Sequence, residues 1–359
     1  MAAPRFHPLT IASIREETAD ARCVTFAIPD ALKDAYAFIP GQYITIRIDQ
    51  DGEDVRRSYS ICSTPDDDGL SVGIRCIAGG SFSETARGLK EDDVLDVMTP
   101  QGRFLAPIGG EHDYLLLAAG SGITPMMSIV RSVLAGEPES RVTLLYANRT
   151  SDSIMFRSAL DDLKDRHLQR FSLAHVLDEE HQEVELLNGR LDAEKLHAFA
   201  RAGVFQPARL DGVYICGPQP MMEAASEAMR ELGVADEKIH YELFTPPGGP
   251  PPTASASDAA TKAAASGVIV EIILDGARRR FSLDEQGETV LDAAGRAGLD
   301  LPYSCKAGMC CTCRCKIVEG TCEMIQNYSL EPWEQEAGFT LACQTRPTSK
   351  ILVLDFDAT

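Results

Sequence analysis

Residues 305–313 read CKAGMCCTC, and one further cysteine, Cys343, stands alone downstream. Cys305, Cys310 and Cys313 have the spacing C-x4-C-x2-C, which together with a distant fourth cysteine is the plant-type 2Fe–2S pattern. Seven of the eleven cysteines lie in this part of the chain. The stretch therefore predicts a 2Fe–2S cluster held by Cys305, Cys310, Cys313 and Cys343.

Four thiolates also suit a tetrahedral zinc ion, so a structural zinc site is the alternative. Zinc-binding chains usually supply cysteines as two close pairs, whereas here the fourth cysteine stands alone, and the spacing favours the cluster. The C-x4-C-x2-C…C pattern does not need the three other cysteines of this segment, Cys311, Cys315 and Cys322. Cys315 alternates with Cys313 as on a strand, which predicts a small buried residue. Cys311 adjoins two ligands, so an exchange of ligands stays open.

A change in composition separates this segment from the rest of the chain. Residues 245–266 read TPPGGPPPTASASDAATKAAAS, rich in proline and small residues and without hydrophobic periodicity. Such a stretch predicts a flexible linker. Residues 267–359 then form the predicted iron–sulfur domain.

The first 244 residues divide near Pro107–His112. Residues 1–108 carry short strand-like runs broken by turn residues, which predict an antiparallel barrel or sandwich. These runs are GQYITIRI at 41–48, RRSYSIC at 56–62 and LSVGIRCI at 70–77.

Residues 109–244 alternate strands with helices. The apolar run YLLLAAG at 114–120 is typical of a buried parallel strand, and the alternation predicts an α/β domain. The other expected strands are 141–147 and 212–217, and the expected helices are 125–135, 154–166 and Met221–Leu232.

Charge and composition argue against several classes of binding partner. The chain has 34 Lys and Arg against 54 Asp and Glu, a net charge of −20, which repels nucleic acid and anionic lipid. The only basic run is Arg278-Arg279-Arg280. No apolar run is long enough to span a membrane, and no secretory signal begins the sequence. We expect a cytoplasmic protein with neither nucleic-acid nor membrane partners.

The tetrapeptide Arg57-Ser58-Tyr59-Ser60 has the form R-x-Y-S. A flavin needs an aromatic face, a polar contact near its reactive nitrogen and a cation for its phosphates. The motif resembles that of the ferredoxin–NADP⁺ reductase superfamily, and the resemblance implies these three roles for Tyr59, Ser60 and Arg57.

Two more elements extend the resemblance. Gly80-Ser81-Phe82-Ser83 matches the family's second flavin element, in which Gly80 and Ser83 bind the FAD pyrophosphate at a helix start. Gly102-Arg103-Phe104 matches the turn that closes the barrel. FAD rather than FMN is implied by the resemblance alone.

The nucleotide motifs follow two expected strands. Residues 120–125, GSGITP, place glycines where backbone passes close to a pyrophosphate. They resemble the family's G-x-G-I-[AT]-P, and residues 216–218, CGP, resemble its second nicotinamide-side motif. The resemblance implies that Gly120, Gly122, Thr124, Cys216, Gly217 and Pro218 bind the coenzyme, with Cys216 beside the nicotinamide.

Arg149 bears on the choice of coenzyme. Asn148 and Arg149 end the strand at 141–147 and precede Thr150 and Ser151. An arginine beside hydroxyl side chains suits a 2′-phosphate, whereas an acidic residue would favour NAD. This arrangement predicts NADPH, with a solvated surface charge as the alternative.

Glu242 and Phe244 match the acidic and aromatic positions of the family segment that returns to the flavin. With Ser60 and Cys216, Glu242 completes the expected catalytic set. The resemblance thus implies an antiparallel β-barrel flavin domain, an α/β parallel-sheet nucleotide domain and a β-grasp (α+β) ferredoxin domain. Because a cluster accepts one electron at a time, the parts together predict a path from NADPH to FAD, to the cluster and to an external acceptor.

The domain order narrows the resemblance to reductase subunits of the phenylacetyl-CoA epoxidase system, a diiron multicomponent oxygenase of phenylacetate degradation. The oxygenase component is the implied partner. The alternatives are the reductase of a Rieske-type aromatic-ring or steroid hydroxylase and a cluster-based redox sensor. Cys311 departs from the family, where a small residue is typical. The motifs are RSYSIC, GGSFS, YANRTSDSIMFRSALDDLKDR, NGRLDAEKL, CGPQPMM and VEGTCEMIQNYSLEPWEQEAGFTLACQTRPTS.

Overall fold

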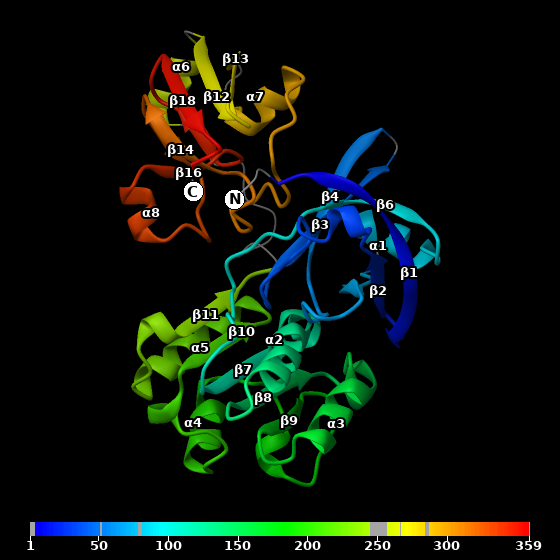
Figure 1. The fold of residues 1–359 in the computed structure, drawn as a ribbon. Helices are drawn as coiled ribbons and strands as arrows, with labels where there is room; N and C mark the ends of the chain where they lie inside the picture. The colour runs from blue at the N-terminus through cyan, green and yellow to red at the C-terminus, as the bar shows by residue number, and fades with distance from the viewer. Residues whose placement is uncertain are drawn as a thin grey trace. The chain divides into compact units, whose positions relative to one another are not determined.

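The computed structural model describes residues 4–50, 52–77, 81–244, 257–265, 267–283 and 287–358. One compact unit comprises His7–Val55 and the chain from Tyr59 to residue 244, and it contains a barrel-like sheet and a parallel sheet (Figure 1). The second unit is formed by the described chain from residue 257 onward, together with the residues up to Phe6 and with Arg56–Ser58. No helix within the described residues has both the length and the apolar character needed to cross a bilayer.

The first sheet has six strands in the order β4-β3-β6-β1-β2-β5. Just after the edge strand β4, Ile61 pairs with Val72 of the other edge strand, β5, and Cys62 N donates to Ser71 O at 2.8 Å. These contacts close the sheet into a barrel. This confirms the predicted antiparallel barrel. Its strands are β1 (Phe6–Thr18), β2 (Ala21–Ala27), β3 (Tyr43–Gln50), β4 (Glu53–Ser60), β5 (Gly69–Arg75) and β6 (Val94–Met98), and helix α1 (Ser81–Gly88) lies between β5 and β6.

The second sheet is parallel and has the order β11-β10-β7-β8-β9. The chain runs outward from the central β7 through β8 and β9, then returns to the other side of β7 for β10 and β11. The strand order therefore reverses between β7 and β10. The strands are β7 (Asp113–Ala119), β8 (Arg141–Asn148), β9 (Phe171–Leu177), β10 (Gly212–Cys216) and β11 (Ile239–Glu242).

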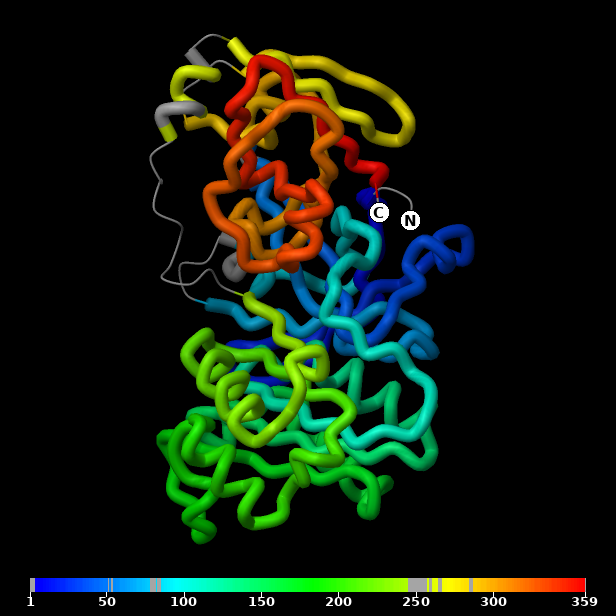
Figure 2. The backbone as a smooth tube through the Cα atoms, turned by 90° about the vertical axis from the view of Figure 1, so that its left-hand side faces the viewer, coloured from blue at the N-terminus to red at the C-terminus, as the bar shows by residue number. Residues whose placement is uncertain are grey.

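Helices cover both faces of this sheet, as the expected α/β domain requires. Side chains of α2 (Ile123–Gly136) and α3 (Arg157–Arg166) share one core with Leu116 and Leu144. Those of α4 (Ala193–Arg201) and α5 (Gln219–Glu231) share another core with the alternate strand residues, such as Leu117. Figure 2 shows this segment, from cyan to yellow-green, as one continuous α/β body.

One helix boundary differs from expectation. The helix expected at 154–166 begins only at Arg157, because Phe156 is left-handed with φ 59°. Ile154 and Phe156 are buried in the core before the helix starts, and Phe156 N donates to Glu17 Oε2 at 3.0 Å. Tertiary packing thus replaces the first turn that the apolar pattern suggested.

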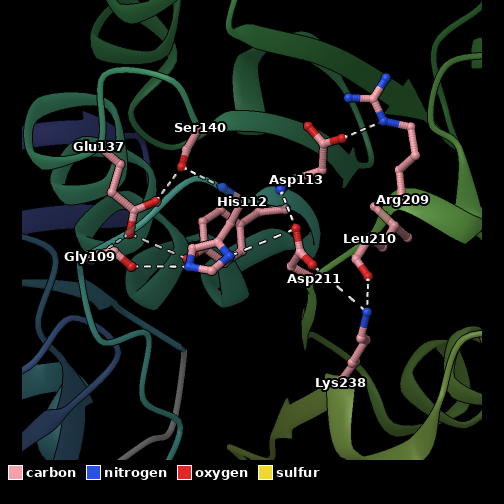
Figure 3. A network of polar contacts seen from close by, with 10 residues as sticks. Gly109, His112, Asp113, Glu137, Ser140, Arg209, Leu210, Asp211 and Lys238 are labelled. Carbon is pink, nitrogen blue, oxygen red and sulfur yellow. Dashed lines mark hydrogen bonds and ion pairs between the residues drawn. The ribbon is translucent and has the colours of Figure 1, made fainter.

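Hydrogen bonds fix the segment that joins the barrel to the parallel sheet (Figure 3). Gly109 N donates to Glu137 Oε1 at 2.8 Å, and His112 N donates to Ser140 Oγ at 2.8 Å. The Glu137 carboxylate is fully buried and also accepts from the Ser140 hydroxyl at 2.6 Å. Asp113 N donates to Asp211 Oδ2 at 3.0 Å, which ties the start of β7 to the loop before β10.

The second unit has a mixed five-stranded sheet of order β13-β12-β18-β14-β16, with α7 (Val290–Arg296) packed into its core, which confirms the predicted β-grasp arrangement. β12 and β18 are parallel neighbours, whereas β12 and β13 are antiparallel. The elements are β12 (Val268–Leu274), β13 (Ala277–Leu283), β14 (Arg314–Glu319), β15 (Cys322–Met324), α8 (Pro332–Glu336), β16 (Phe339–Leu341), β17 (Thr345–Pro347) and β18 (Ile351–Asp355).

The extent of the predicted linker needs correction. Within 245–266, Asp258–Ala265 forms helix α6, with Ala260 and Ala263 buried, and Ala263 packs in the core of the second unit. Alanine has the highest helix propensity, and a small apolar stripe suffices to seat a short helix. Residues 245–256 and 266 lie outside the described part of the chain.

Candidate functional site

The carboxyl ends of β7 and β10 meet where the strand order of the parallel sheet reverses, which is the usual ligand position in open α/β sheets. The turn Gly120–Gly122 follows β7, and residues 217–218 follow β10. The two nucleotide motifs that the sequence singled out are therefore neighbours in space.

Ser60 and Glu242 join the barrel to this edge of the parallel sheet. The Ser60 hydroxyl, at the end of β4 and 3% exposed, donates to Glu242 Oε2 at 2.9 Å. Glu242 is the last residue of β11. Burial raises the pKa of Glu242 to about 7, and the Ser60 hydrogen bond opposes that rise. The carboxyl group can therefore gain or lose a proton near neutral pH.

Cys216 lies beside this pair. It ends β10, is fully buried, and is opposite Glu242 in the β10–β11 register. Burial, and then the Glu242 charge, raise the pKa of the Cys216 thiol. The thiol thus stays protonated at neutral pH, and the structure brings together all three residues of the expected catalytic set.

The other residues predicted to bind the flavin differ in how exposed they are. Tyr59 is half-buried, and its ring lies 5.4 Å from that of Phe82 in α1. The Arg57 side chain is exposed, and Phe244 is 42% exposed. An accessible aromatic ring, a hydroxyl–carboxyl pair and an exposed cation fit the chemistry of a flavin. Gly80 lies outside the described residues, and Ser83 is in α1, where its backbone alone is described.

Close backbone contact explains the glycines of the nucleotide turn. A Cβ on Gly122 would lie 2.1 Å from Cys216 O, so no larger residue fits there. Gly120 has φ +52°, and the Tyr146 hydroxyl donates to its carbonyl at 3.0 Å. A Cβ on Gly217 would lie 3.0 Å from Ala119 Cβ. The backbones of the two loops therefore lie so close at the reversal point that side chains larger than hydrogen are excluded there.

Two further candidates begin helices at this edge. Thr124 is 2% exposed in the first turn of α2, and its hydroxyl donates to Ser121 O at 3.0 Å. Pro218 is the N-cap of α5. Both helices thus start at the reversal point, where their free backbone N–H groups favour an anion.

Asn148 and Arg149 lie at the end of β8. Asn148 is 8% exposed, and its side chain lies beside the Tyr146 hydroxyl. Within the described residues its Nδ2 has no hydrogen-bond partner of regular geometry. The Arg149 side chain is exposed. A buried amide donor next to an exposed cation is suited to an anionic nucleotide.

The sequence did not single out three charged residues near this site. Arg75, the last residue of β5, pairs with Asp20 at 2.9 Å, and its Nη1 lies 3.3 Å from where a Cβ on Gly120 would be. Glu180 Oε2 accepts from Ser151 N at 2.6 Å. No motif marks these residues, because only the fold brings them to the turns; the one signal is their charge.

The four predicted ligand cysteines form two contacting pairs. The Cys305 and Cys310 thiols are in contact, and so are those of Cys313 and Cys343. Nearby donors point at the sulfur atoms: Ala307 N lies 3.4 Å from Cys305 Sγ, and the Thr312 hydroxyl lies 3.2 Å from Cys310 Sγ. Two pairs of thiolates fit two iron ions. Among the described residues, no group of three or more metal-ligating side chains is arranged around one ion position.

The surplus cysteines have other surroundings. Cys315 is fully buried in β14, with Sγ 3.8 Å from Thr340 O, which confirms the expected buried residue. Cys311 is left-handed, with φ 55°, and its thiol donates to Ser329 Oγ at 3.0 Å. Cys322, in β15, is half-buried.

Family models match three segments of the chain. The oxidoreductase FAD-binding domain matches residues 8–105, the oxidoreductase NAD-binding domain residues 116–227, and the 2Fe-2S iron-sulfur cluster binding domain residues 272–348. These matches agree with the barrel, the parallel sheet and the β-grasp unit, respectively.

Full-length relatives share this domain set. One subunit of the 1,2-phenylacetyl-CoA epoxidase of Escherichia coli (strain K12) is 44% identical over 98% of both chains. The ferredoxin reductase component of the 3-ketosteroid-9-alpha-monooxygenase of Rhodococcus rhodochrous is 35% identical over 97% of this chain and 96% of its own. The solved structure of phthalate dioxygenase reductase has the same fold, with a TM-score of 0.58 and 21% identity over 98% of both chains.

These similarities extend over nearly the whole length of the chain, in the domain order that the structure shows. The chain is an oxidoreductase and belongs to the ferredoxin–NADP⁺ reductase superfamily, in the family of oxygenase reductase components that carry FAD-binding, NAD-binding and C-terminal 2Fe–2S domains.

Proposed function

We propose that this protein is the NADPH-dependent reductase component of a diiron oxygenase that epoxidises phenylacetyl-CoA. Its electrons would pass from NADPH to FAD, then to the cluster and to the oxygenase component. The observation that carries the redox part is the Ser60–Glu242 hydrogen bond beside Cys216, which joins the end of the barrel to the reversal point of the parallel sheet. The 44% identity to the 1,2-phenylacetyl-CoA epoxidase protein of Escherichia coli supports the choice of oxygenase.

The side chains of this site have separate tasks in the proposal. Tyr59 offers an aromatic face, Arg57 a cation for phosphate, and the Ser60–Glu242 pair a hydrogen-bonding group able to hold a proton near neutral pH. Bound FAD would supply the conversion of a two-electron hydride into single electrons. Cys216, uncharged and buried, would let the nicotinamide pack without a competing negative charge.

NADPH is proposed over NADH because of Arg149. Its exposed guanidinium lies at the end of β8, next to the buried Asn148 amide, where a 2′-phosphate would gain charge-assisted hydrogen bonds. The Glu180 carboxylate now accepts the hydrogen bond of Ser151 N, so a phosphate at this position would have to displace it.

Reconstitution with purified oxygenase subunits tests the proposal. We expect phenylacetyl-CoA to be epoxidised only when this protein and NADPH are both present, with product formed in step with NADPH consumed. If cytochrome c is reduced rapidly but no product forms, the protein is a reductase for another oxygenase.

A second partner is favoured by the 35% identity to a 3-ketosteroid-9-alpha-monooxygenase reductase component. The same reconstitution with Rieske-type oxygenase subunits and a 3-ketosteroid would identify that partner. A non-catalytic redox sensor would show almost no turnover in either assay.

A further inference from the structure

A cation of the barrel lies against the glycine turn of the nucleotide domain. Arg75 ends β5, and its Nη1 is 3.3 Å from the position that a Cβ on Gly120 would take. Gly120 opens the turn after β7, where phosphates approach the backbone of α/β nucleotide domains. The guanidinium is therefore placed where it can contact an anion bound at this turn.

Asp20 holds this guanidinium. Asp20 Oδ2 accepts from Arg75 Nε at 2.9 Å, and Asp20 Oδ1 accepts from the Thr18 hydroxyl at 2.8 Å. The Asp20 and Arg75 side chains are 39% and 32% exposed, so an incoming ligand can reach both. Desolvation acts to raise the pKa of Asp20, but the Thr18 hydrogen bond and the charges of Arg75 and Arg149 lower it overall. Asp20 is thus a carboxylate at neutral pH, in the field of two arginines.

A carboxylate and a phosphate oxygen use the same guanidinium donors. Asp20 takes the Nε of Arg75, whereas Nη1 is the donor near the Gly120 turn. A phosphate that binds Nη1 therefore shares one guanidinium charge with the Asp20 carboxylate, whose negative charge stays close to the bound phosphate. NADPH carries one more phosphate than NADH, so it meets the larger repulsion.

We propose that Asp20 is a specificity-determining residue that competes with the phosphates of the pyridine nucleotide for Arg75. It weakens coenzyme binding, and it weakens NADPH binding more than NADH binding. The inference rests on the proposed coenzyme site at the Gly120 turn. Asp20, in the β1–β2 turn, belongs to none of the flavin, nucleotide or cysteine motifs of the sequence.

Asp20→Asn in the full-length holoenzyme tests the proposal. The change keeps the shape of the side chain and the Thr18 contact but removes the charge. We expect the Kd of NADP⁺, measured by titration of the oxidised flavin spectrum, to fall by about three- to tenfold, as expected for removing one charge a few ångströms from a phosphate. The Kd of NAD⁺ should fall less, because NAD⁺ carries one phosphate fewer.

Asp67→Asn is the matched control. Asp67 likewise pairs with an arginine and has similar exposure, with Arg131 Nη1 and Nη2 at 2.8 and 2.9 Å, but its arginine belongs to α2 and not to the Gly120 turn. We expect its Kd values to match those of the unmodified protein. If Asp67→Asn tightens binding as much as Asp20→Asn, or if Asp20→Asn leaves Kd unchanged or raises it, the proposal is wrong.

Arg75→Gln separates the proposed route from a general charge effect. In that background Asp20→Asn should change Kd by less than a factor of about two, because the shared guanidinium is gone. A full effect there would show that Asp20 acts without Arg75 and would overturn the proposal. If the unmodified protein prefers NADH, the proposed NADPH specificity is wrong. The role of Asp20 would still be decided by the NAD⁺ titrations of Asp20→Asn and Asp67→Asn.

Discussion

The Ser60 hydroxyl donates a 2.9 Å hydrogen bond to Glu242 Oε2, although the two residues are 182 positions apart in the chain. One ends a barrel strand, and the other ends the last strand of the parallel sheet. The bond therefore depends on how the two sheets pack and places a titratable carboxyl group between the flavin motif and the nucleotide motifs.

Glu242→Gln should remove a pH dependence. Because burial raises the pKa of Glu242 to about 7, the rate of NADPH:ferricyanide reduction should change around that pH in the unmodified protein. The glutamine variant should lack this change and should have a kcat lower by roughly tenfold, since general acid–base groups contribute at least that much. Glu227→Gln, an exposed change in α5, should keep the profile. An unchanged profile in Glu242→Gln would rule out Glu242 as the titrating group.

The same carboxyl group should also make stability depend on pH. The folded pKa of about 7 lies above the ordinary value of 4.5, so between these values the folded protein binds more protons than the unfolded one. Glu242 therefore lowers the free energy of unfolding as pH rises through this window. Denaturant titrations should show a smaller loss of stability between pH 5 and pH 8 for Glu242→Gln, the endpoints chosen to lie at roughly either side of that window. Equal losses would contradict the raised pKa.

Gly122→Ala should disrupt the nucleotide turn. The new Cβ would lie 2.1 Å from Cys216 O, so the two loops must separate at a cost of about 1–3 kcal/mol in unfolding free energy. We expect a rise in KM for NADPH together with a lower thermal midpoint. Gly295→Ala in α7 is the control, because among the described residues no atom outside its own helical turn lies within 4 Å of the new Cβ, and alanine favours the helix. A fully active Gly122→Ala protein would show that the loops can move apart freely.

Arg149→Ala should raise KM for NADPH far more than KM for NADH, by about tenfold or more, because a charge-assisted phosphate contact is lost. Arg201→Ala, at the exposed end of α4, should change neither value. Equal effects of Arg149→Ala on the two coenzymes would refute the 2′-phosphate contact.

Cys343→Ser should abolish the cluster spectrum while flavin reduction by NADPH continues, because Tyr59, Ser60 and the nucleotide motifs lie in the other unit. Cys311→Ser should keep the cluster, since the Cys311 thiol bonds to Ser329. Visible and electron paramagnetic resonance spectra distinguish these outcomes. If the cluster persists in Cys343→Ser but disappears in Cys311→Ser, then Cys311 is the fourth ligand and Cys343 is not.

Local patterns were sufficient for most of the fold. The apolar run before Gly120 gave β7 within one residue, because a strand buried on both faces has no polar positions. Patterns failed where packing decided the backbone: Phe156 is left-handed instead of helical, and Ala260 and Ala263 seat a helix within a stretch whose composition indicated a linker.

The sequence by itself determined the cysteine spacing, the flavin and nucleotide motifs and the alternation of strands and helices, because each is encoded within a few neighbouring residues. Tertiary structure alone decided which residues from different motifs share a site. Ser60 meets Glu242, Gly122 meets Cys216, and Asp20 holds Arg75 over Gly120. Such contacts depend on strand order and on the packing of one sheet against another, and no short stretch of sequence carries that information.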